Sequence, residues 1–79
     1  MKSIHTDEQA ALCQLLRQTR TKAELTQTQL AKKLEVQQSF VSKYESGERR
    51  LDVLELRRVC AALNLSLAEF VRRLDIEIK

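Results

Sequence analysis

The sequence predicts a single all-α domain of five short helices, and three observations lead to this prediction. The 79 residues contain no proline and only one glycine, which disfavours a turn-rich β fold. Several segments begin with Thr, Asp or Ser followed three residues later by Gln or Glu, which is the pattern of a capped helix start. After these starts, apolar residues recur with the spacing of helices that bury one face.

The first helix is predicted to run from about Asp7 to Lys22. Thr6 is its expected N-cap, and Gln9 is the expected partner in a capping box. Its apolar stripe consists of Leu12, Leu15, Leu16, Thr19 and Ala23. Residues 1–5 show no periodicity, so we expect them to be loose, with the single domain spanning residues 1–79.

The stretch from Leu25 to Gly47 predicts two short helices, the first opening at Thr26 and the second near Gln37. Only Glu35 and Val36 remain to turn the chain between them, so the pair reads as a helix-turn-helix. The predicted inner faces carry Leu30, Ala31, Leu34, Val41 and Tyr44. The opposite face of the second helix carries side chains that can hydrogen-bond base edges or phosphates, namely Gln37, Gln38, Ser39, Ser42 and Lys43.

Two further helices are predicted after Gly47, which is available for a left-handed helix end. The fourth starts with Asp52 and Glu55 as a capping box, and its predicted buried residues are Val53, Leu56, Val59, Cys60 and Leu63. Asn64 suits a left-handed helix exit. The fifth starts with Ser66 and Glu69, and its apolar stripe is Leu67, Phe70, Val71 and Leu74. Part of this stripe and Leu65 are expected to stay uncovered, which favours an interface.

The last residues, 75–79, alternate polar and apolar side chains, which is the period of a strand. One interpretation pairs this tail with the same segment of a second subunit, as a dimer contact. The alternative is a frayed continuation of the fifth helix. The sequence leaves both open.

The central motif closely resembles the Cro and phage-repressor type of helix-turn-helix, also called Xre-like, over roughly Leu12 to Phe70. The resemblance is carried by Leu25-Thr26-Gln27, by Leu30-Ala31, and by the run Ser39-x-Val41-Ser42-Lys43-Tyr44-Glu45-x-Gly47. It implies a compact, five-helix, lambda-repressor-like domain that binds DNA. It departs from the family at Glu35, where Gly is frequent, and at Gln37, where a Ser N-cap is frequent.

The resemblance also implies roles for individual residues. Gln27 would contact a phosphate and brace the recognition helix, which spans residues 37–45. Gln38 and Ser39 would enter the major groove, with Ser42 and Lys43 one turn further along, while Arg49 and Arg50 would contact phosphates. Glu45 would pair with Arg20. For Phe40, either a thymine methyl contact or packing at the bundle edge is expected.

Composition narrows the function classes. The net charge is +3 and the pI is near 9.1, which is compatible with a nucleic-acid partner. No apolar run approaches the roughly 20 residues of a membrane span, so we expect a soluble, cytoplasmic protein that binds no membrane. Two cysteines without CxxC spacing and one histidine do not make a zinc site, so no metal or cofactor is expected. We expect Cys13 and Cys60 to be reduced and packed as small apolar residues, and a disulfide or redox switch is the alternative.

The leading hypothesis is a sequence-specific transcriptional regulator that binds a double-stranded, partly palindromic DNA operator as a homodimer. The alternative is a helical protein-interaction module, antitoxin-like or adaptor-like, that binds a protein partner through the fifth helix. An enzyme is disfavoured, because the sequence has no Gly-rich phosphate loop and no catalytic His, Cys or carboxylate arrangement.

Overall fold

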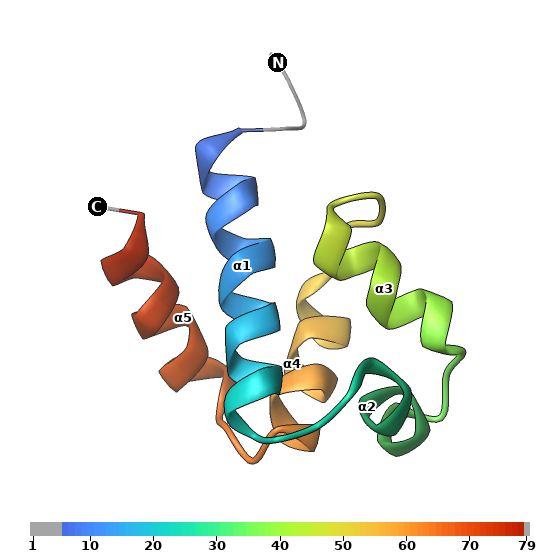
Figure 1. Ribbon diagram of the computed structural model, residues 1–79. Helices are drawn as coiled ribbons and strands as arrows, with labels where there is room; N and C mark the ends of the chain where they lie inside the picture. The colour runs from blue at the N-terminus through green and yellow to red at the C-terminus, as the bar shows by residue number, and fades with distance from the viewer. Residues whose placement is uncertain (1–5, 79) are drawn as a thin grey trace.

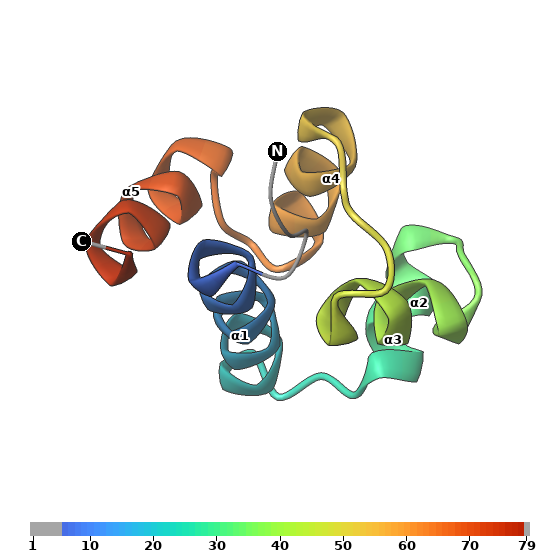
Figure 2. The same ribbon diagram turned by 90° about the horizontal axis from the view of Figure 1, so that it is seen from above.

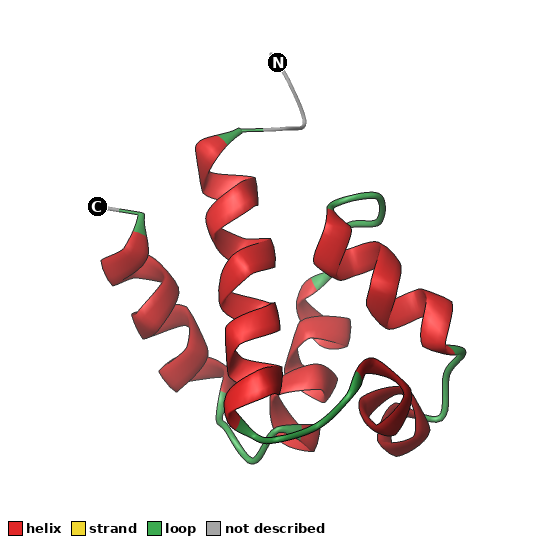
Figure 3. Cartoon of the chain, viewed as in Figure 1, coloured by secondary structure: helices red, strands yellow, loops and turns green. Residues whose placement is uncertain are grey.

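The computed structural model describes residues 6–78, which form five helices and no strand (Figures 1 and 3). They are α1 (Asp7–Lys22), α2 (Gln27–Leu34), α3 (Gln38–Ser46), α4 (Val53–Ala62) and α5 (Leu67–Glu77). The all-α prediction is therefore confirmed for this part of the chain. The expectation of a loose segment at residues 1–5 lies outside the described residues.

The predicted N-caps are all present. Thr6, Thr26, Asp52 and Ser66 each accept a hydrogen bond from the backbone amide three residues later. The reciprocal half of the capping box is formed in α2 and α4. In α5, the Glu69 carboxylate instead pairs with Arg72 and Arg73 on the helix surface. These caps explain why the helix starts agree with the sequence pattern, because a cap depends only on neighbouring residues.

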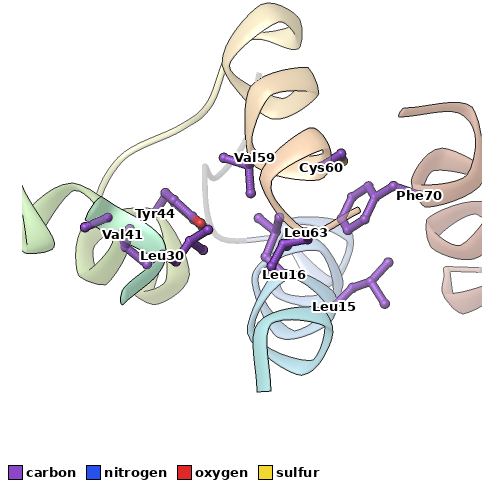
Figure 4. Close-up of a cluster of buried hydrophobic side chains, with 10 residues drawn as sticks. Leu15, Leu16, Leu30, Val41, Tyr44, Val59, Cys60, Leu63 and Phe70 are labelled. Carbon is purple, nitrogen blue, oxygen red and sulfur yellow. The ribbon is translucent and has the colours of Figure 1, made fainter. Parts of the chain in front are cut away.

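The helices enclose one core (Figure 4). Leu30, Val41 and Tyr44 join α2 to α3, while the aromatic ring of Phe70 reaches from α5 toward α4 and α1. The other buried members are Leu15, Leu16, Ala31, Val59, Cys60 and Leu63. Ala31 is buried among them, and α2 packs against α3.

The arrangement leaves α3 at the margin of the bundle. Helix α1 packs against both α3 and α5, and α4 packs against α2 and α5 (Figure 2). In Figure 1 no helix lies along the side of α3 that faces away from α1 and α4. None of the helices in residues 6–78 has the length and apolarity needed to cross a lipid bilayer.

Two predicted core residues are exposed. Val53 is 62% exposed, because it opens α4 at the margin of the stripe formed by Leu56, Val59 and Cys60. Ala23 is also exposed, since it is the C-cap of α1 and lies beyond the last turn that packs on the core. On α5, Val71 is 46% exposed, as expected for an uncovered part of its stripe, whereas Leu65 is partly buried against the core.

The tail is helical as far as it is described. Helix α5 continues through Glu77, with Ile78 as its C-cap, so the strand interpretation of this segment is wrong and the helical one is confirmed for residues 75–77. Ile76 and Ile78 are exposed there. Because residues two positions apart point to nearly opposite sides of a helix, this alternation of isoleucines with acidic residues does not form a single apolar face.

Left-handed residues end several of the helices. Glu35 has φ 59° in the turn between α2 and α3, Gly47 has φ 89° after α3, and Asn64 has φ 59° after α4. Gly47 and Asn64 were predicted to suit left-handed positions, and Glu35 was noted as a departure from the glycine that is frequent in the family at that turn. Glu24, with φ 60°, was not predicted. A glutamate in this conformation carries steric strain that a glycine avoids.

Candidate nucleic-acid interface

The outward face of α3 is polar and accessible. Val41 and Tyr44 are 0% and 2% exposed, and they fix the backbone of α3 from the inner side. On the opposite side Gln38, Ser39 and Lys43 are exposed, and Ser42 is half-buried. The predicted outward orientation of this face is confirmed.

The start of α3 has a weak cap. Gln37 is the N-cap residue, with extended φ and ψ, and its side chain makes no capping hydrogen bond. Its backbone carbonyl accepts from the Phe40 amide at 3.0 Å. The exposed Gln37 side chain is therefore not committed to capping the helix.

A buried ion pair ties α3 to α1. The Arg20 guanidinium donates to both carboxylate oxygens of Glu45, at 2.7 and 3.0 Å, and also to the Leu25 carbonyl at 2.8 Å. The side chains are only 11% and 1% exposed, so water screens this pair weakly. The hydrogen bond to Glu45 raises the pKa of Arg20 above its ordinary value, against the opposing effect of burial. The predicted pairing of Arg20 with Glu45 is confirmed.

Glu45 connects onward to the outward face. Gln27, the first residue of α2, donates from Nε2 to Glu45 Oε1 at 3.0 Å. Gln38 in turn donates from Nε2 to Gln27 Oε1 at 2.7 Å. The bracing contact expected of Gln27 is therefore present, and through Gln27 the Gln38 side chain is connected to the buried carboxylate of Glu45. The phosphate contact of Gln27 stays a prediction.

The end of α3 is also well defined. The amides of Glu48 and Arg49 both donate to the Lys43 carbonyl, at 2.9 and 3.2 Å. A Cβ added to Gly47 would lie 3.8 Å from Cys13 Sγ, an ordinary contact, so the left-handed φ is what favours glycine here. Cys13 donates to the Tyr44 carbonyl at 3.4 Å, which adds another contact from α1 to this helix end.

Arg49 and Phe40 occupy one end of this face. The Arg49 guanidinium lies 4.5 Å from the centre of the Phe40 ring and pairs with Glu55 at 2.8 Å. Phe40 packs edge-on against Tyr44, with ring centroids 5.7 Å apart. The hydrogen bond from Arg49, helped by the backbone amide of Asp52, lowers the pKa of Glu55 to about 2. Glu55 entered the sequence analysis only as a capping residue, because no local pattern links positions six residues apart across a helix start.

The remaining sequence-predicted groups are Arg50 and the two cysteines. Arg50 is exposed in the loop after α3. Cys13 and Cys60 carry free thiols, and burial raises the pKa of Cys60 to about 11. Arg17, which the sequence analysis did not single out, lies with its Nε 3.8 Å from Glu45 Oε1 and is largely exposed.

Comparisons with known proteins agree with this geometry. A helix-turn-helix family model matches residues 16–70. An XRE-family like protein from Pseudomonas syringae pv. tomato str. DC3000 is 38% identical, with a TM-score of 0.83 and coverage of 91% of this chain and 88% of that chain. The clp gene regulator ClgR from Corynebacterium glutamicum is 26% identical, with a TM-score of 0.81 and coverage of 92% and 78%.

A third solved structure shows the same fold. The restriction-modification controller protein C.Esp1396I, solved as a tetramer in complex with its natural 35 base-pair operator, is 23% identical. Its TM-score is 0.84, and the match covers 94% of this chain and 97% of that one. A search among curated proteins finds no match. From the motif match and the 38% identical relative, this chain belongs to the Cro and phage-repressor type, or Xre-like, family of helix-turn-helix DNA-binding regulators.

Proposed function

We propose that this chain is a sequence-specific transcriptional regulator, without enzymatic activity, that acts in the cytoplasm on double-stranded DNA. The observation that carries the proposal is the polar outward face of α3, anchored from behind by Val41 and Tyr44. An α-helix fits the major groove of B-DNA, where each base pair presents a distinct pattern of donors and acceptors. An exposed polar helix face on a rigid support is suited to recognising these donors and acceptors.

The proposed contacts divide into two kinds. Gln38 and Ser39 read base edges near the helix start, with Gln37 beside them, and Ser42 and Lys43 read or neutralise groups one turn further along. Glutamine pairs bidentately with adenine N6 and N7, and a good bidentate pair discriminates by roughly 1–3 kcal/mol. Gln27 and Arg50 contact phosphates. Phosphate contacts set position and affinity, whereas base contacts set sequence preference.

The proposed assembly is a homodimer on a partly palindromic operator. One α3 covers only part of a binding site, and two copies related by a two-fold axis place their helices in half-sites about 34 Å apart. The uncovered apolar residues Val71, Ile76 and Ile78 of α5 support a contact with a second copy. C.Esp1396I, which shares the fold, was solved as a tetramer on its operator.

The experiment that tests the proposal is selection of bound duplexes from a random library, which yields half-site sequence, spacing and symmetry together. Lys43→Ala or Gln38→Ala should change the selected sequence. Arg50→Ala should weaken binding to all sequences and reduce the salt slope by about 1. Enrichment of no sequence by the wild-type chain, together with no salt-dependent binding to mixed duplex, would refute the proposal.

A second candidate function rests on the same exposed α5 residues. In this alternative the chain is an adaptor-like or antitoxin-like module that binds a protein partner through α5, and the helix-turn-helix serves only as structure. Retention on heparin and a salt-dependent mobility shift on mixed duplex separate the two functions. Absence of both, with a monomeric chain in sedimentation, would favour the interaction module.

A further inference from the structure

Three side chains meet where the loop of residues 47–52 leaves the recognition helix. Phe40 comes from the first turn of α3, Arg49 from the loop and Glu55 from the first turn of α4. We call these three residues the loop clamp. They come from three consecutive elements, and the loop clamp is the point where these elements are held together.

Arg49 makes three kinds of contact at once. Its Nη1 donates to Glu55 Oε1 at 3.1 Å and to the Arg50 carbonyl at 3.1 Å, and its Nη2 donates to Glu55 Oε2 at 2.8 Å. The face of the guanidinium lies over Phe40, 4.5 Å from the ring centre. The Nη1–Nη2 edge, which binds a phosphate bidentately when it is available, is thus occupied by a carboxylate.

The partners of Arg49 are themselves fixed. Glu55 Oε1 also accepts from the Asp52 amide at 3.0 Å, which closes the capping box of α4. Phe40 is half-buried against Tyr44, whose side chain is part of the core. The Arg49 amide donates to the Lys43 carbonyl at 3.2 Å. Arg49 therefore fixes the path of the loop relative to both α3 and α4.

We infer that Arg49 is a positioning residue for DNA binding, which holds the loop and its exposed neighbour Arg50 in place, and is not itself a phosphate ligand. The inference rests on the proposed function and revises the role that the family resemblance implied for Arg49. It gives Phe40 the role of a platform for the guanidinium at the bundle edge. Affinity for DNA then depends on a residue that does not touch the duplex.

The first test exploits the difference between arginine and lysine. Lysine keeps the charge but cannot make the bidentate contact and the ring contact together. Arg49→Lys should lower affinity for the selected operator by roughly threefold to tenfold, because both the ring contact and the paired edge are lost. Its salt slope should stay that of the wild type. The matched control, Arg50→Lys, should keep the wild-type affinity, since a lysine also neutralises a phosphate.

A phosphate-ligand role for Arg49 predicts the opposite pattern. Arg49→Lys would then lose no more operator affinity than Arg50→Lys does, and Arg49→Ala would reduce the salt slope by about 0.9. Either result overturns the inference. Wild-type binding is measured first, and a wild type that binds no duplex removes the proposed function before the loop clamp is tested. Circular dichroism melts establish that each variant is folded at the assay temperature.

The second test uses the partners of Arg49. Glu55→Gln keeps a capping residue for Asp52 but removes the charge that holds Arg49. If Arg49 positions the loop, operator affinity falls although the chain becomes more positive. If Arg49 binds phosphate, its release raises affinity. Phe40→Tyr keeps an aromatic ring and should bind like the wild type, whereas Phe40→Leu should lose affinity for operator and non-specific duplex alike, because Arg50 is then displaced from its phosphate. Equal binding by both Phe40 variants contradicts the platform role.

Discussion

Removing one partner of the buried pair between Arg20 and Glu45 should destabilise the chain more than removing both. The perturbation is a double-mutant cycle of Arg20→Met, Glu45→Met and the double variant. Methionine fills a comparable space without a charge and adapts to irregular surroundings. The matched control is Arg72→Met, which breaks the exposed pair with Glu69.

The magnitude follows from burial and geometry. With the two side chains 11% and 1% exposed, each single variant leaves one buried ion without its counter-ion, at a cost of roughly 3–5 kcal/mol. The whole domain is expected to have a free energy of unfolding of about 4–12 kcal/mol at this length. The double variant loses the Leu25 and Gln27 hydrogen bonds but leaves no lone charge, so we expect a cost of about 1–3 kcal/mol.

The assay is urea unfolding followed by the helical circular dichroism signal. The cycle should give a coupling free energy of about 3 kcal/mol or more between the two positions. Arg72→Met should change stability by less than about 0.5 kcal/mol, because an exposed ion pair contributes little. The double variant should fold and still bind the operator poorly, since Gln27 loses its acceptor.

Two results would refute the reasoning. Single variants that each cost less than about 1 kcal/mol would make the pair equivalent to a surface contact. Additive costs in the double variant would show that the two charges do not stabilise one another.

Two further predictions concern the turn residue and the loop clamp. Glu35→Gly should raise the free energy of unfolding by about 0.5–1 kcal/mol, because φ 59° strains a residue with a Cβ; the control Lys33→Gly, inside α2, should lower it by about 1 kcal/mol. The pKa of Glu55 is lowered from 4.5 to about 2, so its stabilising effect is present above about pH 4.5 and is lost as pH falls toward 2. The difference in urea midpoint between wild type and Glu55→Gln should shrink over that range, and a constant difference would contradict this assignment.

The helices were predictable because their signals are local. The N-caps at Thr6, Thr26, Asp52 and Ser66 need only neighbouring residues, and all four are formed in the structure. The left-handed ends at Gly47 and Asn64 follow from residue type alone. Glu24 shows the limit of this approach, since a glutamate gives no warning of a positive φ.

Burial was predicted correctly in the middle of helices, and its prediction failed at their ends. Val53 lies on the periodic stripe of α4 but in its first turn, where no neighbouring helix covers it. The same limit applies to residues 75–77, where alternation suited both a strand and a helix end. A repeat of so few residues does not separate a period of 2 from one of 3.6.

The outward face of α3 followed from the period of a single helix, and the pairing of Arg20 with Glu45 followed from family resemblance. Neither helix periodicity nor family resemblance predicted the loop clamp. Phe40, Arg49 and Glu55 meet only because the loop folds back between two helices, so no spacing rule connects them. The hydrogen bond between Gln27 and Gln38 likewise depends on the crossing of α2 and α3.

The buried carboxylate of Glu45 also fixes the direction of the hydrogen bonds that connect it to the surface of α3. An ionised carboxylate only accepts hydrogen bonds, so the Gln27 amide points its nitrogen toward Glu45 and its oxygen outward. The Gln38 amide therefore donates from its nitrogen to that oxygen. Exchange of Glu45 for glutamine would leave one acceptor oxygen where Arg20 now donates to two, and it would allow the amide of Gln27 to face either way round. The Gln38 amide would then present its donor and acceptor to a base in either of two orders, and one base pair of the operator would be read ambiguously.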